Sequence, residues 1–229
     1  PKLSFEYCWS LLLAGKYEMA APLLERLEQA AQGIPAFLGE VLAAQAYLAR
    51  ATGSHERMVL CSQRALELLP KSSLNSRGIV ALNLGLAYWH MGKMQAAESV
   101  LTEALEAARA TDNLYAATAA MIFLGRVLAV RGLLRQAAGV FHKAIDQGGE
   151  MPINLLAHMD LAALHYEWND LERSDTHLQK ALTLCLPSHN DEFLAGCCLM
   201  ESSLRIAQGN LAGAEAALDK VGAQASAGK

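Results

Sequence analysis

The sequence has few aromatic residues and little charge. Aromatic side chains make up 6% of its 229 residues and charged side chains 18%, whereas 53% are hydrophobic, many of them alanine and leucine. These small apolar side chains suit a continuous core of helix packed on helix. The formal net charge is −4, so the segment lacks the basic footprint of a protein that grips nucleic acid directly. We therefore expect no direct nucleic-acid binding by this segment.

The sequence also lacks membrane, export and disulfide signals. No run of about 18 apolar residues is free of polar interruptions, and no basic stretch with a cleavage site opens the chain. The cysteines are odd in number and have no framework spacing: Cys8, Cys61, Cys185, Cys197 and Cys198. This favours a reducing, cytoplasmic setting with small buried thiols and no membrane partner. Because the chain begins with proline and no polar capping helix precedes Lys2–Leu13, we expect a segment of a longer protein with flanking domains.

Motifs for catalysis and metal binding are absent as well. The sequence contains no G-x-x-x-x-G-K-[ST], G-x-S-x-G, H-E-x-x-H or C-x-x-C. Cys197 and Cys198 are adjacent, so on a helix their side chains diverge by about 100° and cannot easily hold one metal ion. His158 and His165 share a helix face, but no third ligand follows at a recognisable spacing, and we expect them to be structural. We expect no enzyme activity, no cofactor and no metal site.

What the sequence does contain is a repeat. A glycine, once replaced by asparagine, returns six times at intervals of 37 to 40 residues. These turn residues are Gly15, Gly53, Gly92, Gly132, Asn169 and Gly209. Repetition at a period of this size indicates stacked two-helix units, each of which buries its apolar face against its neighbours.

The third unit shows how each repeat is built. Gly85 carries no side chain, so a neighbouring helix can approach it closely, and Tyr88, one turn later, fills the groove beside it. Gly92 then ends the first helix in a conformation that needs positive φ. The second helix presents an apolar stripe of Ala97, Leu101 and Ala104.

This order of residues resembles the tetratricopeptide (TPR) repeat. The fourth unit repeats it with Leu124, Gly125, Gly132, Ala137, Phe141 and Ala144, and the sixth unit matches it least, with Glu201, Ser202 and Arg205 on its first helix. The resemblance implies an all-α fold, a right-handed superhelical solenoid of about six TPR-like repeats with about twelve antiparallel helices. We place this single solenoid at residues 1–221, with 222–229 as a disordered tail or linker.

The repeats are longer than the 34 residues most common in TPR proteins. Units of this length, with this alanine-, leucine- and glutamine-rich texture, look like the helical-repeat sensor region of MalT-like, LuxR-type transcription regulators. In that family a nucleotide-binding module precedes the repeats and a helix-turn-helix follows them. The resemblance implies a cytoplasmic signal-sensing domain whose partners include the flanking domains of the same polypeptide.

In TPR proteins the first helix of each repeat lines the concave face, and the corresponding positions here are unusually apolar. Three interpretations are open: tight winding that buries these residues, self-association or docking of a partner helix or other protein segment, and a pocket for a small-molecule effector. Aromatic platforms beside polar groups suit a sugar or another polar metabolite. The candidate ligand-binding residues are Tyr47, Arg50, Asn83, Trp89, His90, Arg126, Tyr166 and Glu167. The alternative function is a generic TPR adaptor that binds a peptide or helix.

Overall fold

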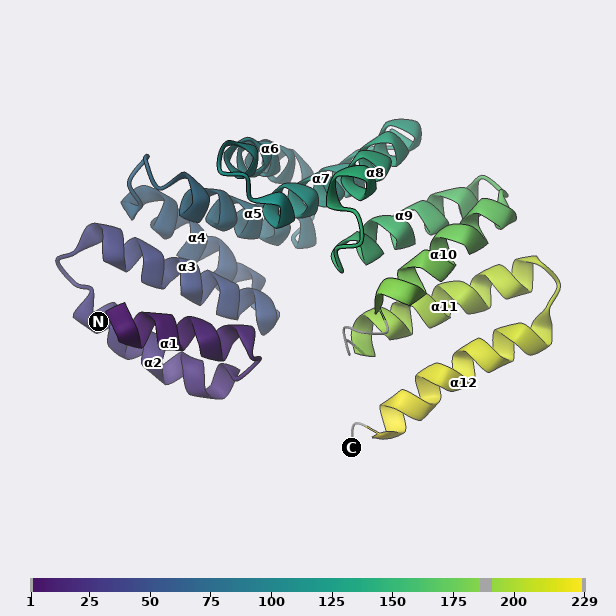
Figure 1. The fold of residues 1–229 in the computed structure, drawn as a ribbon, viewed down its shortest axis with the longest axis horizontal. Coiled ribbons are helices and arrows are strands. Elements are labelled where there is room, and N and C mark those ends of the chain that lie inside the picture. Colours follow the sequence, from purple (N-terminus) through teal and green to yellow (C-terminus); the bar gives the residue numbers. More distant parts are fainter. Residues whose placement is uncertain (1, 186–190, 228–229) are drawn as a thin grey trace. The chain divides into compact units, whose positions relative to one another are not determined.

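The computed structural model describes residues 2–185 and 191–227, and within these ranges the chain forms twelve α-helices and no strand. Figure 1 shows the helices following one another as antiparallel pairs. This confirms the all-α helical-repeat class. The helices are α1 (Lys2–Leu13), α2 (Tyr17–Ala30), α3 (Pro35–Ala51), α4 (His55–Leu68), α5 (Leu74–His90), α6 (Met94–Ala110), α7 (Leu114–Val130), α8 (Leu134–Gly148), α9 (Asn154–Glu167), α10 (Leu171–Cys185), α11 (Asp191–Ala207) and α12 (Leu211–Ala227).

All six predicted turn residues join the two helices of a repeat, and all have positive φ, between 58° at Asn169 and 77° at Gly132. The residue after each turn donates its backbone N–H to a carbonyl five residues earlier, for example Lys93 to Tyr88 at 2.8 Å. This is the hydrogen bond of the Schellman motif, which satisfies a carbonyl at the helix end. Since L-residues other than glycine and asparagine rarely adopt this conformation, the turn chemistry fixes where each first helix stops.

The chain divides into two compact units, Pro1–Val127 and Leu128–Lys229. In the first unit, the first helices α3 and α5 lie side by side, and each packs against its own second helix, α4 or α6. Every residue of α5 from Val80 to Ala87 is buried. A helix that is apolar all round is covered on several sides, as α5 is.

Gly85 is a position of close approach between the two helices of the third repeat. A Cβ atom built on Gly85 would lie 2.6 Å from both Cγ and Cδ2 of Leu101 on α6, and Leu101 is fully buried. The predicted role of this glycine, to admit the neighbouring helix, is therefore confirmed in its geometry.

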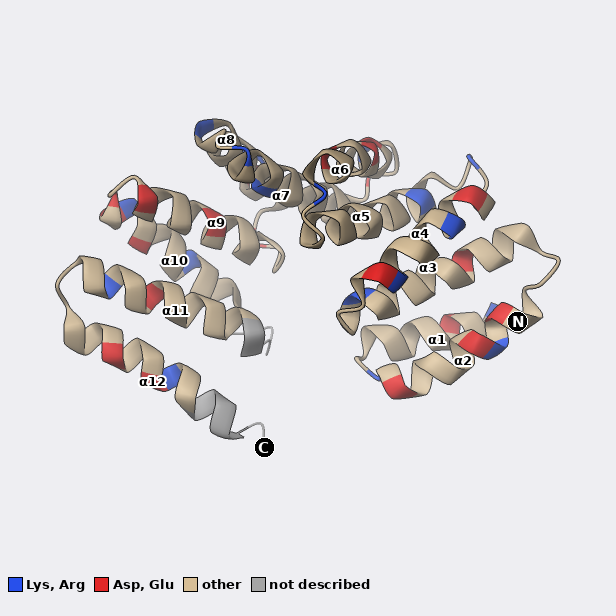
Figure 2. Cartoon of the chain, turned by 180° about the vertical axis from the view of Figure 1, so that it is seen from behind, with Lys and Arg blue, Asp and Glu red and all other residues tan. Residues whose placement is uncertain are grey.

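Charged residues are distributed unevenly in the first unit. The helices α5 and α7 each carry one Lys, Arg, Asp or Glu residue, Arg77 and Arg126, whereas α6 carries four. Figure 2 shows α5 and α7 as largely uncharged ribbons. The first helices thus form the apolar layer, and the second helices supply most of the solvated charge.

Polar links join α11, the first helix of the sixth repeat, to its neighbours α10 and α12 in the second unit, where the TPR resemblance is weakest. The guanidinium of Arg205 on α11 donates to both carboxylate oxygens of Asp175 on α10, at 2.9 and 3.1 Å. Glu201, also on α11, pairs with Lys220 of α12 at 3.1 Å. The residues that depart from the repeat pattern therefore form ion pairs between neighbouring helices.

The end of the last helix extends past the predicted boundary. α12 continues to Ala227, so the helix covers most of the segment from residue 222 onward for which we expected a tail or linker. Alternating alanines in this segment explain the difference, because alanine has the highest helix propensity and no proline interrupts the run.

The prediction of small buried cysteine side chains is confirmed, because all five cysteines are buried and none forms a disulfide. Burial raises the pKa of Cys197 to about 12, so its sulfur stays protonated and unreactive. Separately, none of the helices in the described ranges combines the length and apolar character needed to span a membrane.

Candidate functional site

The predicted residues of the second repeat form one stacked pair on α3. The Cζ atom of Arg50 lies 4.6 Å from the centre of the Tyr47 ring, and both side chains are half-buried. Trp9 of α1 also contacts Tyr47, with its ring centre 5.5 Å from that of Tyr47 in an edge arrangement. A guanidinium over an aromatic face gains cation–π attraction and keeps N–H groups that can donate to an oxygen-rich ligand.

A second pair of the same kind lies on α5 and α7. The Cζ atom of Arg126 is 5.5 Å from the ring centre of Trp89 and 5.0 Å from that of Phe123. His90 makes an edge contact with Trp89 at 4.8 Å and stacks on His55 of α4 at 4.5 Å. The structure therefore brings together three of the predicted residues, Trp89, His90 and Arg126. It adds Phe123 and His55, which the sequence analysis did not select.

Asn83 lies in the interior of the first unit. We expected it to orient a ligand from an open face, yet it is 1% exposed and its Nδ2 donor has no hydrogen-bond partner. The indole Nε1 of Trp89 is likewise buried without a partner. An unsatisfied buried donor costs about 1–3 kcal/mol, so both groups would gain from an acceptor. Three apolar residues of the first helices α5 and α7, Leu82, Leu86 and Ile122, are also buried.

The remaining predicted residues, Tyr166 and Glu167, belong to the second unit. Tyr166 is half-buried and packs against the core cluster that contains Ala162 and Leu178. Glu167 is exposed at the end of α9. These two residues form a separate candidate surface, because they belong to the second unit whereas the arginine–aromatic pairs belong to the first.

The sequence analysis also missed a pocket in the first unit. The pocket measures about 330 Å³ and lies among α2, α3, α4 and the turn between the last two. Its lining contains none of the eight predicted residues. The polar side chains around it belong to Tyr17, Glu18, Gln45, Thr52, Ser54 and Arg57. No motif predicts this pocket, because its lining comes from three helices and depends on how they pack.

Histidines of the second unit are arranged differently from the sequence expectation. His165 is 6% exposed, as a core position requires, and His158 is half-buried. Two more histidines join them from neighbouring helices, His142 of α8 and His177 of α10. The sequence analysis found only the pair on α9, because residues on three different helices share no short spacing.

A family model described as "MalT-like TPR region" matches residues 39–227. Among curated proteins, the HTH-type transcriptional regulator MalT of Serratia proteamaculans (strain 568) is 23% identical over 230 residues. The match covers 96% of this chain and 25% of the regulator, so the chain spans about a quarter of that relative's length.

Solved structures with similar folds come from several kinds of protein. The apo form of the quorum sensor NprR from B. thuringiensis aligns with a TM-score of 0.78 and 14% identity, covering 96% of this chain and 63% of that one. BtubC (BKLC) from P. vanneervenii gives 0.69 and 18%, covering 94% and 91%. PilW, a type IV pilus biogenesis factor, gives 0.70 and 15%, covering 97% and 92%. At these identities the similarity establishes the fold alone, a helical repeat of the kind that serves as an interaction scaffold.

Proposed function

We propose that this chain, which belongs to the family of MalT-like TPR regions, is the helical-repeat sensor and interaction domain of a bacterial LuxR-type transcription regulator. It binds a small effector or a partner domain on the face built by the first helices of its repeats. Binding is coupled to neighbouring nucleotide-binding and DNA-binding domains. The similarity to a regulator named HTH-type supports this assignment, as does the likeness in fold to a quorum sensor.

The observation that carries the proposal is the pair of arginine–aromatic stacks in the first unit. Arg50 lies over Tyr47, and Arg126 lies over Trp89, on first helices of three successive repeats. Flat apolar rings pack against the C–H faces of a sugar or similar metabolite, while the guanidinium groups donate to its oxygens. The buried Nε1 of Trp89, which has no hydrogen-bond partner, adds a donor to the same group.

Coupling to other domains follows from a shift in population. An effector that contacts side chains on neighbouring first helices favours the arrangement of repeats in which those side chains converge. Such a ligand can shift the equilibrium only by its difference in affinity for the two arrangements. Contacts with flanking domains then change because the helices that carry them have moved.

The test is a ligand panel of sugars and common metabolites, read by thermal unfolding and tryptophan fluorescence. A ligand at 100 times its dissociation constant should stabilise the chain by about 2.7 kcal/mol, a shift of a few degrees. We expect Arg126→Gln to abolish the response. The matched control is Arg64→Gln, because Arg64 is exposed on the second helix α4 of the same unit and should leave the response unchanged.

Two outcomes would count against an effector site on this face. A response that survives both Arg126→Gln and Arg50→Gln would place the ligand elsewhere, for example in the pocket among α2, α3 and α4. A flat panel would favour a generic TPR adaptor that binds a peptide or helix. The gene offers an independent test, because a P-loop module upstream and a helix-turn-helix downstream are expected of the regulator and not of a free-standing adaptor.

A further inference from the structure

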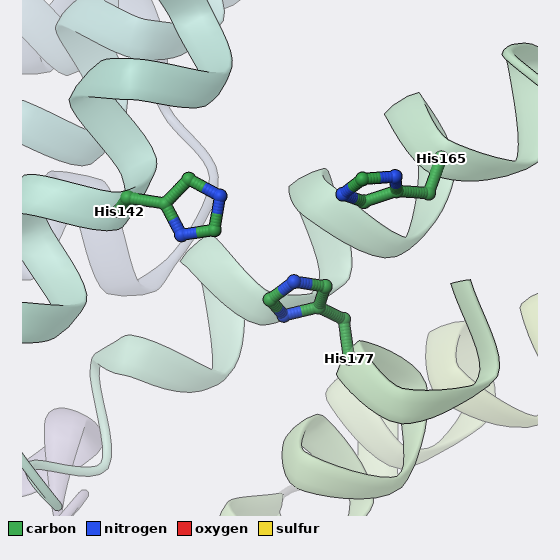
Figure 3. A group of neighbouring side chains, drawn as sticks. All are labelled: His142, His165 and His177. Carbon is green, nitrogen blue, oxygen red and sulfur yellow. The ribbon is translucent and has the colours of Figure 1, made fainter. Parts of the chain in front are cut away.

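Four histidines gather in the second unit, and they come from three consecutive helices. His142 lies on α8, His158 and His165 on α9, and His177 on α10. The ring centre of His177 is 5.7 Å from that of His142, 5.2 Å from His158 and 5.5 Å from His165. Figure 3 shows His142, His165 and His177 around a common space. His177 is therefore the centre of the cluster.

One ring nitrogen from each of His142, His165 and His177 lies within 4.8 Å of the other two. In a tetrahedral zinc site with Zn–N distances of about 2.0–2.1 Å, ligand nitrogens are about 3.3 Å apart. To bind one ion, the ring nitrogens must therefore move closer together by about an ångström or more, which rotation of the rings can achieve. His142 is exposed and can make this movement without disturbing the core, whereas His165 is buried and His177 half-buried, so both are held in place by packing.

Two of these three rings have a polar partner at the nitrogen that would face away from a metal ion. Nδ1 of His177 lies 3.0 Å from Nδ1 of His158, so one ring donates and the other accepts. Nδ1 of His165 lies 3.5 Å from the carboxylate oxygen Oδ2 of Asp170, too far for a well-formed hydrogen bond but close enough to be drawn in. When Nδ1–H is the donor in each pair, the lone pair of Nε2 is left for a metal ion. Metal-binding histidines in proteins have outer partners of this kind.

Neutral imidazole is the form of histidine that binds a metal ion, and His165 is buried while His177 is half-buried, a setting that favours the uncharged ring.

We propose that His142, His165 and His177 bind one divalent transition-metal ion of the imidazole-preferring kind, with Zn²⁺ as the reference ion. His158 and Asp170 orient the rings, and the fourth position on the metal is open to water or another ligand. The ion ties together the second helix of one repeat and both helices of the next. Because a repeat contacts only its neighbours, this tie fixes the angle between two successive repeats. In this proposal His165 is a metal ligand and His158 orients another ring, whereas the sequence predicted a purely structural role for both.

The test uses tag-free chain, stripped with EDTA and dialysed, then titrated with ZnCl₂ by calorimetry. We expect one ion per chain with a dissociation constant of micromolar or below, and a rise in unfolding temperature that EDTA reverses. Co²⁺ in place of Zn²⁺ should give the strong visible absorption of a tetrahedral site. His142→Gln should weaken binding at least about tenfold and remove this absorption without affecting the fold, since His142 is exposed.

The first unit provides the matched control. His55 and His90 stack at 4.5 Å, and among the described residues no third metal-binding side chain joins them. His55→Gln therefore removes one member of a close histidine pair and should leave Zn²⁺ affinity unchanged. His177→Gln should abolish binding, with circular dichroism to verify the fold. The proposal is overturned if Zn²⁺ binds only at millimolar concentration, or if affinity is the same in His142→Gln and His177→Gln as in the parent chain.

Discussion

Replacing Gly85 with alanine tests whether close approach of two helices is what the repeat pattern encodes. Gly85 lies in the middle of α5, and the position where its Cβ would stand is 2.6 Å from Cγ and Cδ2 of Leu101. Carbon atoms in good contact are about 3.5–4.0 Å apart. The added methyl group therefore requires a movement of about an ångström by a leucine that is fully buried.

Two opposing effects set the size of the change. Forcing an extra methyl into a packed core costs about 1–3 kcal/mol, and the upper half of that range applies because the contact is with Cγ rather than with a flexible chain end. Alanine also stabilises a helix relative to glycine by about 0.5–1 kcal/mol. The net expectation for Gly85→Ala is a loss of about 1–2.5 kcal/mol. For a chain of this length each kcal/mol lowers the unfolding temperature by about 2–4 °C.

Urea unfolding followed by circular dichroism measures the change, with Gly139→Ala as the matched control. Gly139 lies inside helix α8, is exposed, and would place its Cβ more than 4 Å from other atoms, so only the gain in helix propensity remains and the variant should be more stable. In Gly85→Ala/Leu101→Ala the clash is absent, so the double variant should be less destabilised than the sum of its parts. Equal effects of the two glycine replacements would refute the packing argument.

Three further predictions concern the second unit. Asp175→Asn should lower the free energy of unfolding by about 1 kcal/mol, because it breaks the bidentate link to Arg205. The same link lowers the pKa of Asp175 below its usual 3.8. The contribution of Asp175 to stability, measured by urea unfolding, should therefore disappear as pH falls below about 4. Asn169→Ala should lower the free energy of unfolding by about 1–2 kcal/mol, since φ at this position is 58°, whereas Asn169→Gly should not destabilise the chain. Comparing the melting temperatures of the two variants tests this. In EDTA, stability should fall as pH drops from 6.5 toward about 4, because the unfolded chain protonates His177 more readily than the folded one does; a stability profile that is flat over this interval would contradict it.

The repeat pattern predicted the fold because the turns are encoded locally. A residue at positive φ is usually glycine, and less often asparagine or aspartate, so the six turn residues can be read from the sequence without any knowledge of packing. The close packing of Leu101 against Gly85 can be predicted in the same way, because glycine has no side chain. The extent of α12 was underestimated because small residues near Gly222 suggest a linker but also favour a helix when alanine predominates.

The candidate site was less predictable because burial on the first helices does not follow one amphipathic face. α5 is covered by α6, its own second helix, and by both helices of the preceding repeat, α3 and α4, so Asn83 is as buried as the leucines beside it. Counting back from the turn residue could therefore identify Trp89 but could not exclude Asn83. Phe123 and His177 escaped selection because their partners lie on other helices, and the register between helices depends on packing rather than on spacing in the sequence.

The two proposed ligands, the effector and the metal ion, bind to different parts of the chain. Titrations can show whether the two binding events are coupled. The effector face is built on α3, α5 and the part of α7 that carries Arg126, whereas the metal site is built on α8, α9 and α10. Each ligand fixes the packing of its own repeats, and α7 is the helix that continues from one unit into the other. If Zn²⁺ changes the affinity for an effector, the effector must change the affinity for Zn²⁺ by the same factor. Titrating each in the presence of the other therefore distinguishes two independent sites from one coupled sensor, because independence requires both affinities to stay the same.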